Sequence, residues 1–143
     1  MQQIVLKEIE LKVAQMNVEI QTKEQKQKKG SWEAEYTSSA RTLLRTVWLM
    51  DFITMMFKLI DENRDKSLSN IGKESYSKTL GIHHPWVVRQ AAKVAIYAMP
   101  SRETLILNTG LTFEQCKEIS SNADLIKTEL WAFFKEHKLD NLQ

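Results

Sequence analysis

The sequence predicts an all-α protein. Only four Gly and two Pro occur among its 143 residues, whereas turn-rich β architectures need many of both. Apolar side chains recur at steps of three and four residues through most of the chain, which is the period of an amphipathic helix. Hydrophobic residues make up 43% and charged residues 27% of the chain, a mixture typical of a globular protein. At this length we expect a single domain, residues 1–143, with one core.

Composition also disfavours several classes of function. The single cysteine, Cys116, leaves no internal disulfide and no Cys-based zinc site, and it fits a reducing compartment. The three histidines, His83, His84 and His137, form no HExxH zinc motif. A net charge of +2 gives no general field for nucleic acid. We therefore expect a cytoplasmic protein without cofactor, metal, nucleic-acid partner or membrane-spanning segment.

The first predicted helix covers residues 5–25. One stripe at alternating steps of three and four consists of Leu6, Ile9, Val13, Met16 and Ile20. A second apolar line, on another face, consists of Ile4, Leu11 and Val18. A helix that is apolar on two sides suits a position between neighbouring helices or between partner chains. A coiled-coil arm is the alternative.

A polar stretch, residues 23–39, follows with Gly30 as a helix breaker. Its lysine-rich cluster, residues 23–29, is either a solvated face or, together with Trp32 and Tyr36, a contact with an anionic membrane surface. The second predicted helix covers residues 39–62. Its wide apolar face consists of Leu44, Val47, Trp48, Phe52, Met55, Met56, Leu59 and Ile60.

Shorter elements are predicted after a polar loop at residues 63–72. A short helix covers residues 73–80 and ends at Gly81 as its C-cap. The next helix covers residues 84–99, with Pro85 in its first turn, and Pro100 ends it. We expect Pro85 and Trp86 to fasten the start of this helix onto the core.

The C-terminal part is predicted to hold two further helices joined by a turn. Ser101 caps a brief helix over residues 101–107, and Gly110 closes it. Thr112 opens a turn. Ser121 then caps the last helix, residues 122–137, with Asp124 placed for a capping box.

Arg41 and Arg45 are the first candidate binding residues. They stand four residues apart, so a helix places both guanidinium groups on one face, where like charges repel unless an anion lies between them. Guanidinium groups bind phosphate or carboxylate by paired hydrogen bonds. The alternative is that both are surface residues with packed stems and solvated heads.

A second candidate is the His83-His84-Pro85-Trp86 segment, which follows a glycine-bounded turn. A histidine near the start of a helix is biased toward its neutral form by the helix dipole, and it can then donate one hydrogen bond in a fixed tautomer. The alternative is a capping or packing histidine.

Two longer segments resemble the glycolipid transfer protein family. They are SARTLLRTVWLMDFI, residues 39–53, and YSKTLGIHHPWVVRQAAKVAIYAMPSR, residues 76–102. The resemblance extends over residues 39–108 and is greatest to the ceramide-1-phosphate transfer branch of that family. It implies a two-layer helical sandwich that holds one sphingolipid, with the headgroup at a surface cleft and the acyl chains in an apolar pocket. The implied activity is lipid transfer between membranes, without catalysis.

The resemblance also implies roles for individual residues. Arg41 and Arg45 match the arginine pair that holds the phosphate, whereas relatives that carry neutral glycolipids have a tryptophan in place of Arg45. His84 matches the histidine that hydrogen-bonds the ceramide amide region, and Trp86 matches a structural tryptophan. His83 receives no role. The apolar pocket would include Trp48, Phe52, Val87, Ala91 and Val94.

The chain departs from the family before Arg41, because only forty residues precede it. Family members carry an aspartate and a nearby lysine or asparagine on an upstream helix. In one register the first residues match the helix just before the arginine helix, so the aspartate-bearing helices are missing and the domain is truncated. In the other register Glu8 and Lys12 take the place of the aspartate and lysine. We prefer the first register.

A truncated sandwich would expose apolar surface, which favours dimerisation through the first helix. Two functions therefore stay open. The chain is a carrier of a phosphosphingolipid, with transient contact to a membrane surface, or it is a helical interaction or lipid-sensor module that has lost transfer activity. An enzyme is disfavoured, because no catalytic triad, carboxylate pair or phosphate-binding loop stands out.

Overall fold

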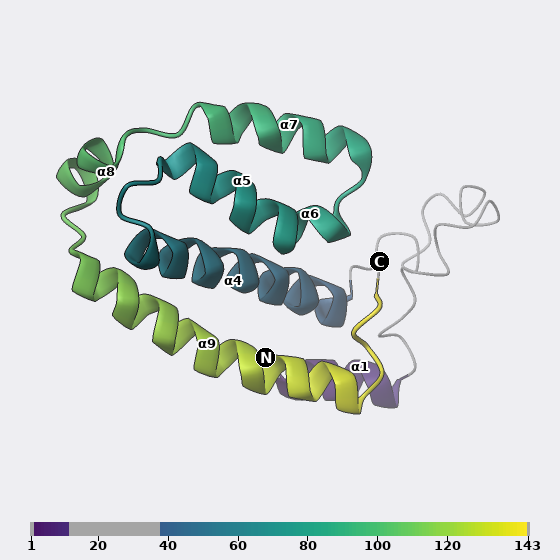
Figure 1. Ribbon diagram of the computed structural model, residues 1–143. Helices are drawn as coiled ribbons and strands as arrows, with labels where there is room; N and C mark the ends of the chain where they lie inside the picture. The colour runs from purple at the N-terminus through teal and green to yellow at the C-terminus, as the bar shows by residue number, and fades with distance from the viewer. Residues whose placement is uncertain (1, 12–37, 143) are drawn as a thin grey trace. The chain divides into compact units, whose positions relative to one another are not determined.

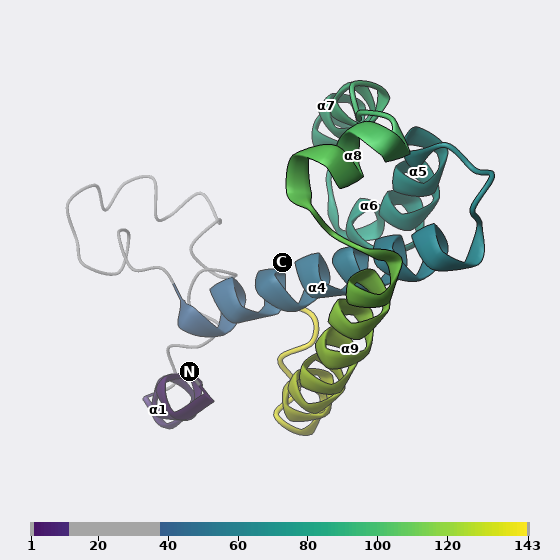
Figure 2. The same ribbon diagram turned by 90° about the vertical axis from the view of Figure 1, so that its left-hand side faces the viewer.

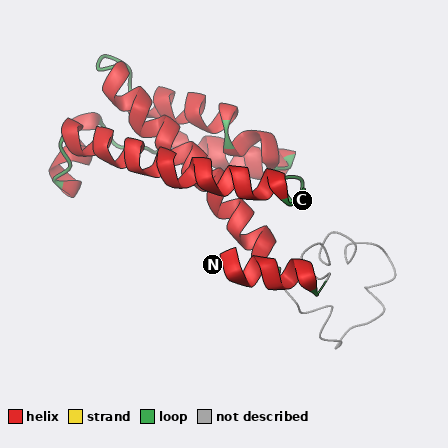
Figure 3. Cartoon of the chain, turned by 90° about the horizontal axis from the view of Figure 1, so that it is seen from below, coloured by secondary structure: helices red, strands yellow, loops and turns green. Residues whose placement is uncertain are grey.

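The computed structural model describes residues 2–11 and 38–142 of the chain. Throughout these ranges the regular structure is helical, with no strand (Figure 3). The all-α prediction is confirmed. No helix in the described ranges is long and apolar enough to cross a membrane.

The chain divides into two compact units. The first consists of Met1–Val47 and Leu130–Gln143, and the second of Trp48–Glu129. Two long helices, α4 (Ser39–Glu62) and α9 (Phe113–Glu136), contribute residues to both units (Figure 1).

The first unit contains α1 (Gln2–Glu10), the start of α4, the end of α9 and the C-terminal tail. Its buried apolar side chains come from all of these segments: Val5, Ala40, Leu43, Leu44, Val47, Phe134, Leu139 and Leu142. The core of this unit is thus assembled from parts of the sequence more than a hundred residues apart.

The buried face of α1 differs from the predicted stripe. Val5 and Glu8, three residues apart, are buried, whereas Leu6 and Ile4 are exposed. The reason is that the Glu8 carboxylate bonds the start of α4, which turns the Val5 side of α1 inward. Residues 12–25 of the predicted first helix lie outside the described residues.

The second unit is built around the C-terminal part of α4. It adds α5 (Leu68–Lys78), α6 (Leu80–His83), α7 (Trp86–Tyr97) and α8 (Arg102–Thr109). Within this unit α5 lies between α4 and α7, and α8 lies past the end of α7 (Figure 1); in Figure 2, which faces this end, α8 is seen in front of α5 and α7. The core consists of Ile60, Leu68 and Ile71, with Met56, Phe57, Leu59, Leu105 and Phe113 packed against it.

The start of α4 shows why the prediction of this helix is correct at both ends. Ser38 is its N-cap, because its hydroxyl accepts the Arg41 backbone N–H at 3.3 Å while its carbonyl accepts that of Thr42 at 3.1 Å. At the other end Asn63 donates its backbone N–H to Leu59 O at 3.0 Å and leaves the helix. Both signals are local.

The predicted loop over residues 63–72 is wrong in its second half. Ser67 accepts the Asn70 N–H at 3.3 Å and starts α5 at Leu68. Gly72 therefore lies inside a helix, where a Cβ would meet Met99 Sδ at 2.7 Å and Ile96 Cγ2 at 3.2 Å. A missing side chain lets α5 and the end of α7 approach closely, so this glycine is not a loop signal.

Gly81 is likewise not the predicted C-cap, because it lies within α6. Pro85 precedes α7 as its N-cap with ψ 161° instead of occupying its first turn. The brief helix after Ser101 is confirmed: Ser101 accepts the Thr104 N–H at 3.2 Å, and Gly110 closes α8 with φ +67°.

A break before Ser121 was predicted, but α9 is continuous from Phe113. Its true start is a capping box, in which Thr112 Oγ1 accepts the Gln115 N–H at 3.2 Å and Gln115 Oε1 accepts the Thr112 N–H at 2.8 Å. Ser121 is exposed to solvent and lies in the middle of α9 instead of at its start. Its neighbour Ser120 is buried and donates to Thr54 O at 3.2 Å, which keeps this part of the helix packed on α4.

Gly81 offers a test of the close packing between α5 and α6. A Cβ at Gly81 would lie 2.8 Å from the backbone oxygen of Tyr76 and 3.2 Å from its ring, and backbone does not yield easily. We expect Gly81→Ala to lower the free energy of unfolding by about 1–3 kcal/mol, measured by urea denaturation. Gly72→Ala is the matched control and should cost less, because a flexible Met99 end can move. Equal stabilities for Gly81→Ala and the unaltered protein would contradict the close approach.

Candidate functional site

Arg41 and Arg45 lie on the first two turns of α4, in the first unit. Arg41 is buried, at 6% exposure, whereas Arg45 is exposed. Burial and then the nearby Arg45 charge lower the pKa of Arg41. The positive charge of Arg45 thus lies close enough to Arg41 to disfavour its charged form. An anion held by both would relieve this repulsion.

Glu8 of α1 contacts the N-terminal end of α4 and is buried, at 4% exposure. Its Oε1 accepts the Ser39 N–H at 2.6 Å, and its Oε2 accepts the Ala40 N–H at 2.9 Å and the Ser38 hydroxyl at 3.2 Å. A carboxylate is favourable at a helix N-terminus, where backbone N–H groups lack partners within the helix. Glu8 therefore fixes the start of α4. A direct contact of Glu8 with a headgroup stays a prediction.

The second unit contains the histidines. His83 stacks flat on Trp48, with ring centroids 3.9 Å apart and an interplanar angle of 2°. Burial is the main cause that lowers the pKa of His83, with a smaller contribution in the same direction from His84 and an opposing one from Asp51. His83 is therefore biased toward its neutral form, packed on a tryptophan that is itself 7% exposed.

His84 is the last residue before Pro85, in an extended conformation between α6 and α7. Its Nδ1 lies 2.9 Å from the hydroxyl of Tyr76 on α5. Burial raises the pKa of Tyr76, against a smaller lowering by the Arg89 charge, so the phenol keeps its proton at neutral pH. The Tyr76 contact fixes one ring nitrogen of His84 and leaves Nε2 for another partner.

Trp86 and the predicted pocket residues of α7 lie on exposed surface. Trp86 is 66% exposed, so the prediction that it fastens α7 onto the core is wrong. Val87 and Val94 are 69% and 71% exposed, and Ala91 is exposed too. The buried contact of α7 is Ile96, and about 200° of helix rotation separates it from Val94. Of the predicted pocket set, Trp48 is buried and Phe52 is partly buried, both on α4.

Several predicted contacts lie outside the described residues. These are Lys12, Trp32, Tyr36 and the lysine-rich cluster, residues 23–29. Within the described ranges, no group of three or more His, Cys, Asp or Glu side chains could hold a metal ion. Cys116 is buried, and burial raises the pKa of its thiol.

The sequence assigned no role to His83 and did not single out Tyr76. The Trp48–His83 stack joins residues 35 positions apart, and no periodic pattern in the sequence indicates it. Tyr76 precedes His84 by eight residues, but the chain turns at Thr79 between α5 and α6, so helical spacing does not predict their contact. The YSKTLGIHHPW segment contains Tyr76, His83 and His84, but their order along the chain does not reveal their geometry.

Several known proteins are similar to this chain in sequence. The sequence model of the glycolipid transfer protein (GLTP) family matches residues 1–110. The ceramide-1-phosphate transfer protein of Xenopus laevis is 35% identical over 105 residues, which are 69% of this chain and 47% of that protein. Accelerated cell death 11 of Arabidopsis thaliana is 33% identical over 70 residues, covering 48% of this chain and 34% of that protein.

Solved structures show a shared fold. The structure of human ceramide-1-phosphate transfer protein in complex with 12:0 ceramide-1-phosphate matches with a TM-score of 0.77 and 23% identity, and the match covers 98% of this chain and 64% of that chain. The chain thus spans about half the length of the Xenopus laevis relative and under two thirds of the human structure.

Proposed function

Because this chain belongs to the glycolipid transfer protein family, we propose that it binds one phosphate-headed sphingolipid, ceramide-1-phosphate, and carries it between membranes. The observation that supports this most is the arginine pair on the first turns of α4. A neutral glycolipid offers these two cations no charge, whereas a phosphate accepts hydrogen bonds from both guanidinium groups.

In this proposal Arg41 and Arg45 bind the phosphate in different ways. Arg41 is buried, so its side chain needs little further ordering when it binds a phosphate. Arg45 is exposed and donates further hydrogen bonds to the phosphate from the solvent side. Glu8 and Ser38 act indirectly, because their hydrogen bonds hold the turn from which Arg41 projects.

His84 is proposed to bind the amide region of the lipid. If the Tyr76 hydroxyl donates to Nδ1 over the 2.9 Å contact, Nε2 of His84 bears the ring proton and can donate it to a ligand. A ceramide amide carbonyl is a suitable acceptor. His84 would then recognise the part that phosphorylated and glycosylated sphingolipids share, while the arginines recognise the phosphate.

A carrier must also contact membranes, and we propose that this contact is transient and favours anionic surfaces. Exposed aromatic side chains such as Trp86 and Tyr97 suit the membrane interface, and the lysine-rich cluster at residues 23–29 would add attraction to anionic lipids. Salt-sensitive sedimentation with anionic vesicles would support this contact.

The exposed apolar side chains of α7 support a second candidate, an interaction module without transfer activity. Val87, Ala91 and Val94 form an apolar face on α7, and Ile4 and Leu11 are exposed near α1. Faces of this kind mark protein partners as well as lipid contacts. A second copy of the chain is the partner that we propose for this case.

A transfer assay separates the two candidates. Donor vesicles carry fluorescent ceramide-1-phosphate or fluorescent glucosylceramide, and the rate of movement to acceptor vesicles is measured with the full chain. We expect transfer of the phosphate-headed lipid at a clearly higher rate than of the neutral one. Absence of transfer for both, together with a dimer in analytical ultracentrifugation, would favour the interaction module.

A further inference from the structure

A groove of about 890 Å³ lies between α5 and α7 in the second unit. The walls supply basic side chains (Lys66, Lys73, Arg89 and Lys93) and apolar or aromatic ones (Tyr76, Ile82, Trp86, Ile96 and Tyr97). Its volume falls within the range of sites that bind small organic ligands, roughly 300–1,000 Å³. The arginine pair of α4 is not among its lining residues, and the proposed function gives no role to the basic side chains of the groove.

The charges of this groove are unbalanced. Among the described residues, its lining includes four cations but a single carboxylate, Glu74. Glu74 is already engaged by Lys66 and Lys78, the latter at 2.7 Å, and these contacts lower its pKa to about 2. No acidic residue occurs on α7. The groove is therefore open to an anion, with its one carboxylate already neutralised on the α5 side.

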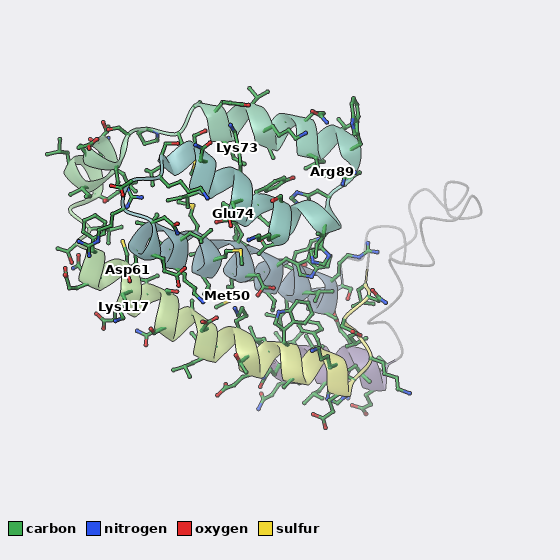
Figure 4. All side chains as sticks on the ribbon, in the orientation of Figure 1. Met50, Asp61, Lys73, Glu74, Arg89 and Lys117 are labelled. Carbon is green, nitrogen blue, oxygen red and sulfur yellow. The ribbon has the colours of Figure 1, made fainter. Side chains whose placement is uncertain are left out.

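The free cations lie on both walls. Arg89 and Lys93 stand four residues apart on α7, on one side of the helix, and both are exposed. Neither forms an ion pair with another residue of the described ranges. On the facing wall the ammonium group of Lys73 lies 3.7 Å from the ring centroid of Tyr97, which orders its position. Figure 4 shows Lys73 extending from α5 toward α7, with Arg89 on α7 itself.

The walls are in close contact at one end of the groove and border His84 at the other. The missing side chain of Gly72 lets Ile96 and Met99 approach α5 closely. At the other end Tyr76, which lines the groove, contacts His84 Nδ1. An anion beside Arg89 would thus lie next to the tyrosine that orients His84.

We propose that the groove between α5 and α7 is a second anion site, which binds a phosphate-bearing ligand through Lys73, Arg89 and Lys93. Cations from two helices converge on one space, aromatic side chains border it, and Glu74, the one carboxylate that the described residues contribute to it, is paired with lysines. The phosphate belongs either to a soluble phosphate compound or to the headgroup of an anionic lipid. The proposal does not rest on the function proposed for the arginine pair.

The test uses the full chain with Arg89→Gln and Lys93→Gln combined. Inorganic pyrophosphate, followed by isothermal titration calorimetry, probes the soluble source. Phosphatidylcholine vesicles that contain phosphatidic acid, followed by sedimentation against pure phosphatidylcholine vesicles, probe the lipid source. The control combines Lys58→Gln with Lys117→Gln, which removes two exposed cations of the same unit that do not line the groove.

The double variant should weaken binding in at least one arm about tenfold, because two charge-assisted contacts are lost, while the control changes it less than about twofold. Pyrophosphate binding identifies a soluble ligand, and vesicle binding alone identifies a lipid headgroup. No binding in either arm, or equal losses for the double variant and the control, would overturn the proposal. Binding of ceramide-1-phosphate is measured in parallel: the double variant should keep it, so failure of this site and failure of the arginine site remain distinguishable.

Discussion

Replacing Arg45 with leucine is expected to weaken the binding of ceramide-1-phosphate by about one to two orders of magnitude. A charge-assisted hydrogen bond contributes roughly 1.5–3 kcal/mol, and about 1.4 kcal/mol corresponds to a tenfold change in the dissociation constant. Arg45 is exposed, which favours the lower end of this range. Loss of Arg45 also leaves the buried Arg41 as the sole cation of the pair. Calorimetry with short-chain ceramide-1-phosphate measures the effect.

Two controls make this prediction specific. Binding of a neutral glycolipid, where it occurs, should change far less with Arg45→Leu, because its headgroup carries no charge. His84→Ala should weaken both lipid classes, because its proposed partner is the amide region that they share. Unchanged phosphosphingolipid binding in Arg45→Leu, or a preference of the unaltered protein for a neutral glycolipid, would show that the arginine pair is not the phosphate site.

Arg102 is only partly buried. Among the residues of the second unit that are not fully buried, its replacement, here with methionine, should cause the largest loss of stability. Its guanidinium donates to three backbone oxygens: Ile60 O at 2.8 Å, Asn63 O at 2.5 Å and Lys66 O at 2.9 Å. These carbonyls belong to the end of α4 and the turn before α5, where helical partners are lacking. We expect the free energy of unfolding to fall by about 2–4 kcal/mol, measured by urea denaturation.

Arg64→Met is the matched control for this prediction. Arg64 lies in the turn before α5 that Arg102 contacts. Its own contacts are weaker: an ion pair with Asp61 at 4.0 Å, and a guanidinium carbon 4.8 Å from the Phe113 ring centroid. Its side chain is 66% exposed. Its loss should cost less than about 1 kcal/mol. A similar small loss for Arg102→Met would mean that water replaces the guanidinium at these carbonyls without penalty.

Local signals in the sequence were sufficient for several elements and insufficient for others. The bounds of α4, the Ser101 cap and the left-handed Gly110 follow from propensities and caps that act within one or two turns. Gly72 and Gly81 misled the prediction, because their role is close packing between α5, α7 and Tyr76 rather than helix termination. Such contacts depend on tertiary structure, which spacing along a helix does not encode.

The candidate site shows the same division. The i,i+4 spacing of Arg41 and Arg45 identified a pair that interacts electrostatically. Three other features depend on segments that are distant in sequence. These are the burial of Arg41, the contact of Glu8 with the start of α4, and the stack of His83 on Trp48. The exposure of Val87 and Val94 depends on which side of α7 packs on α5, and amphipathic patterning did not determine that side.

The central claim is that this chain binds a phosphate-headed sphingolipid, and native mass spectrometry tests it most directly. The purified full chain is incubated with equal amounts of ceramide-1-phosphate and galactosylceramide and then ionised under non-denaturing conditions. We predict a complex of one ceramide-1-phosphate per chain, well above the galactosylceramide complex, and its loss when Arg41 and Arg45 are both replaced with leucine. A spectrum without a bound lipid, or with both lipids bound equally in the unaltered protein and the double variant, would contradict the claim.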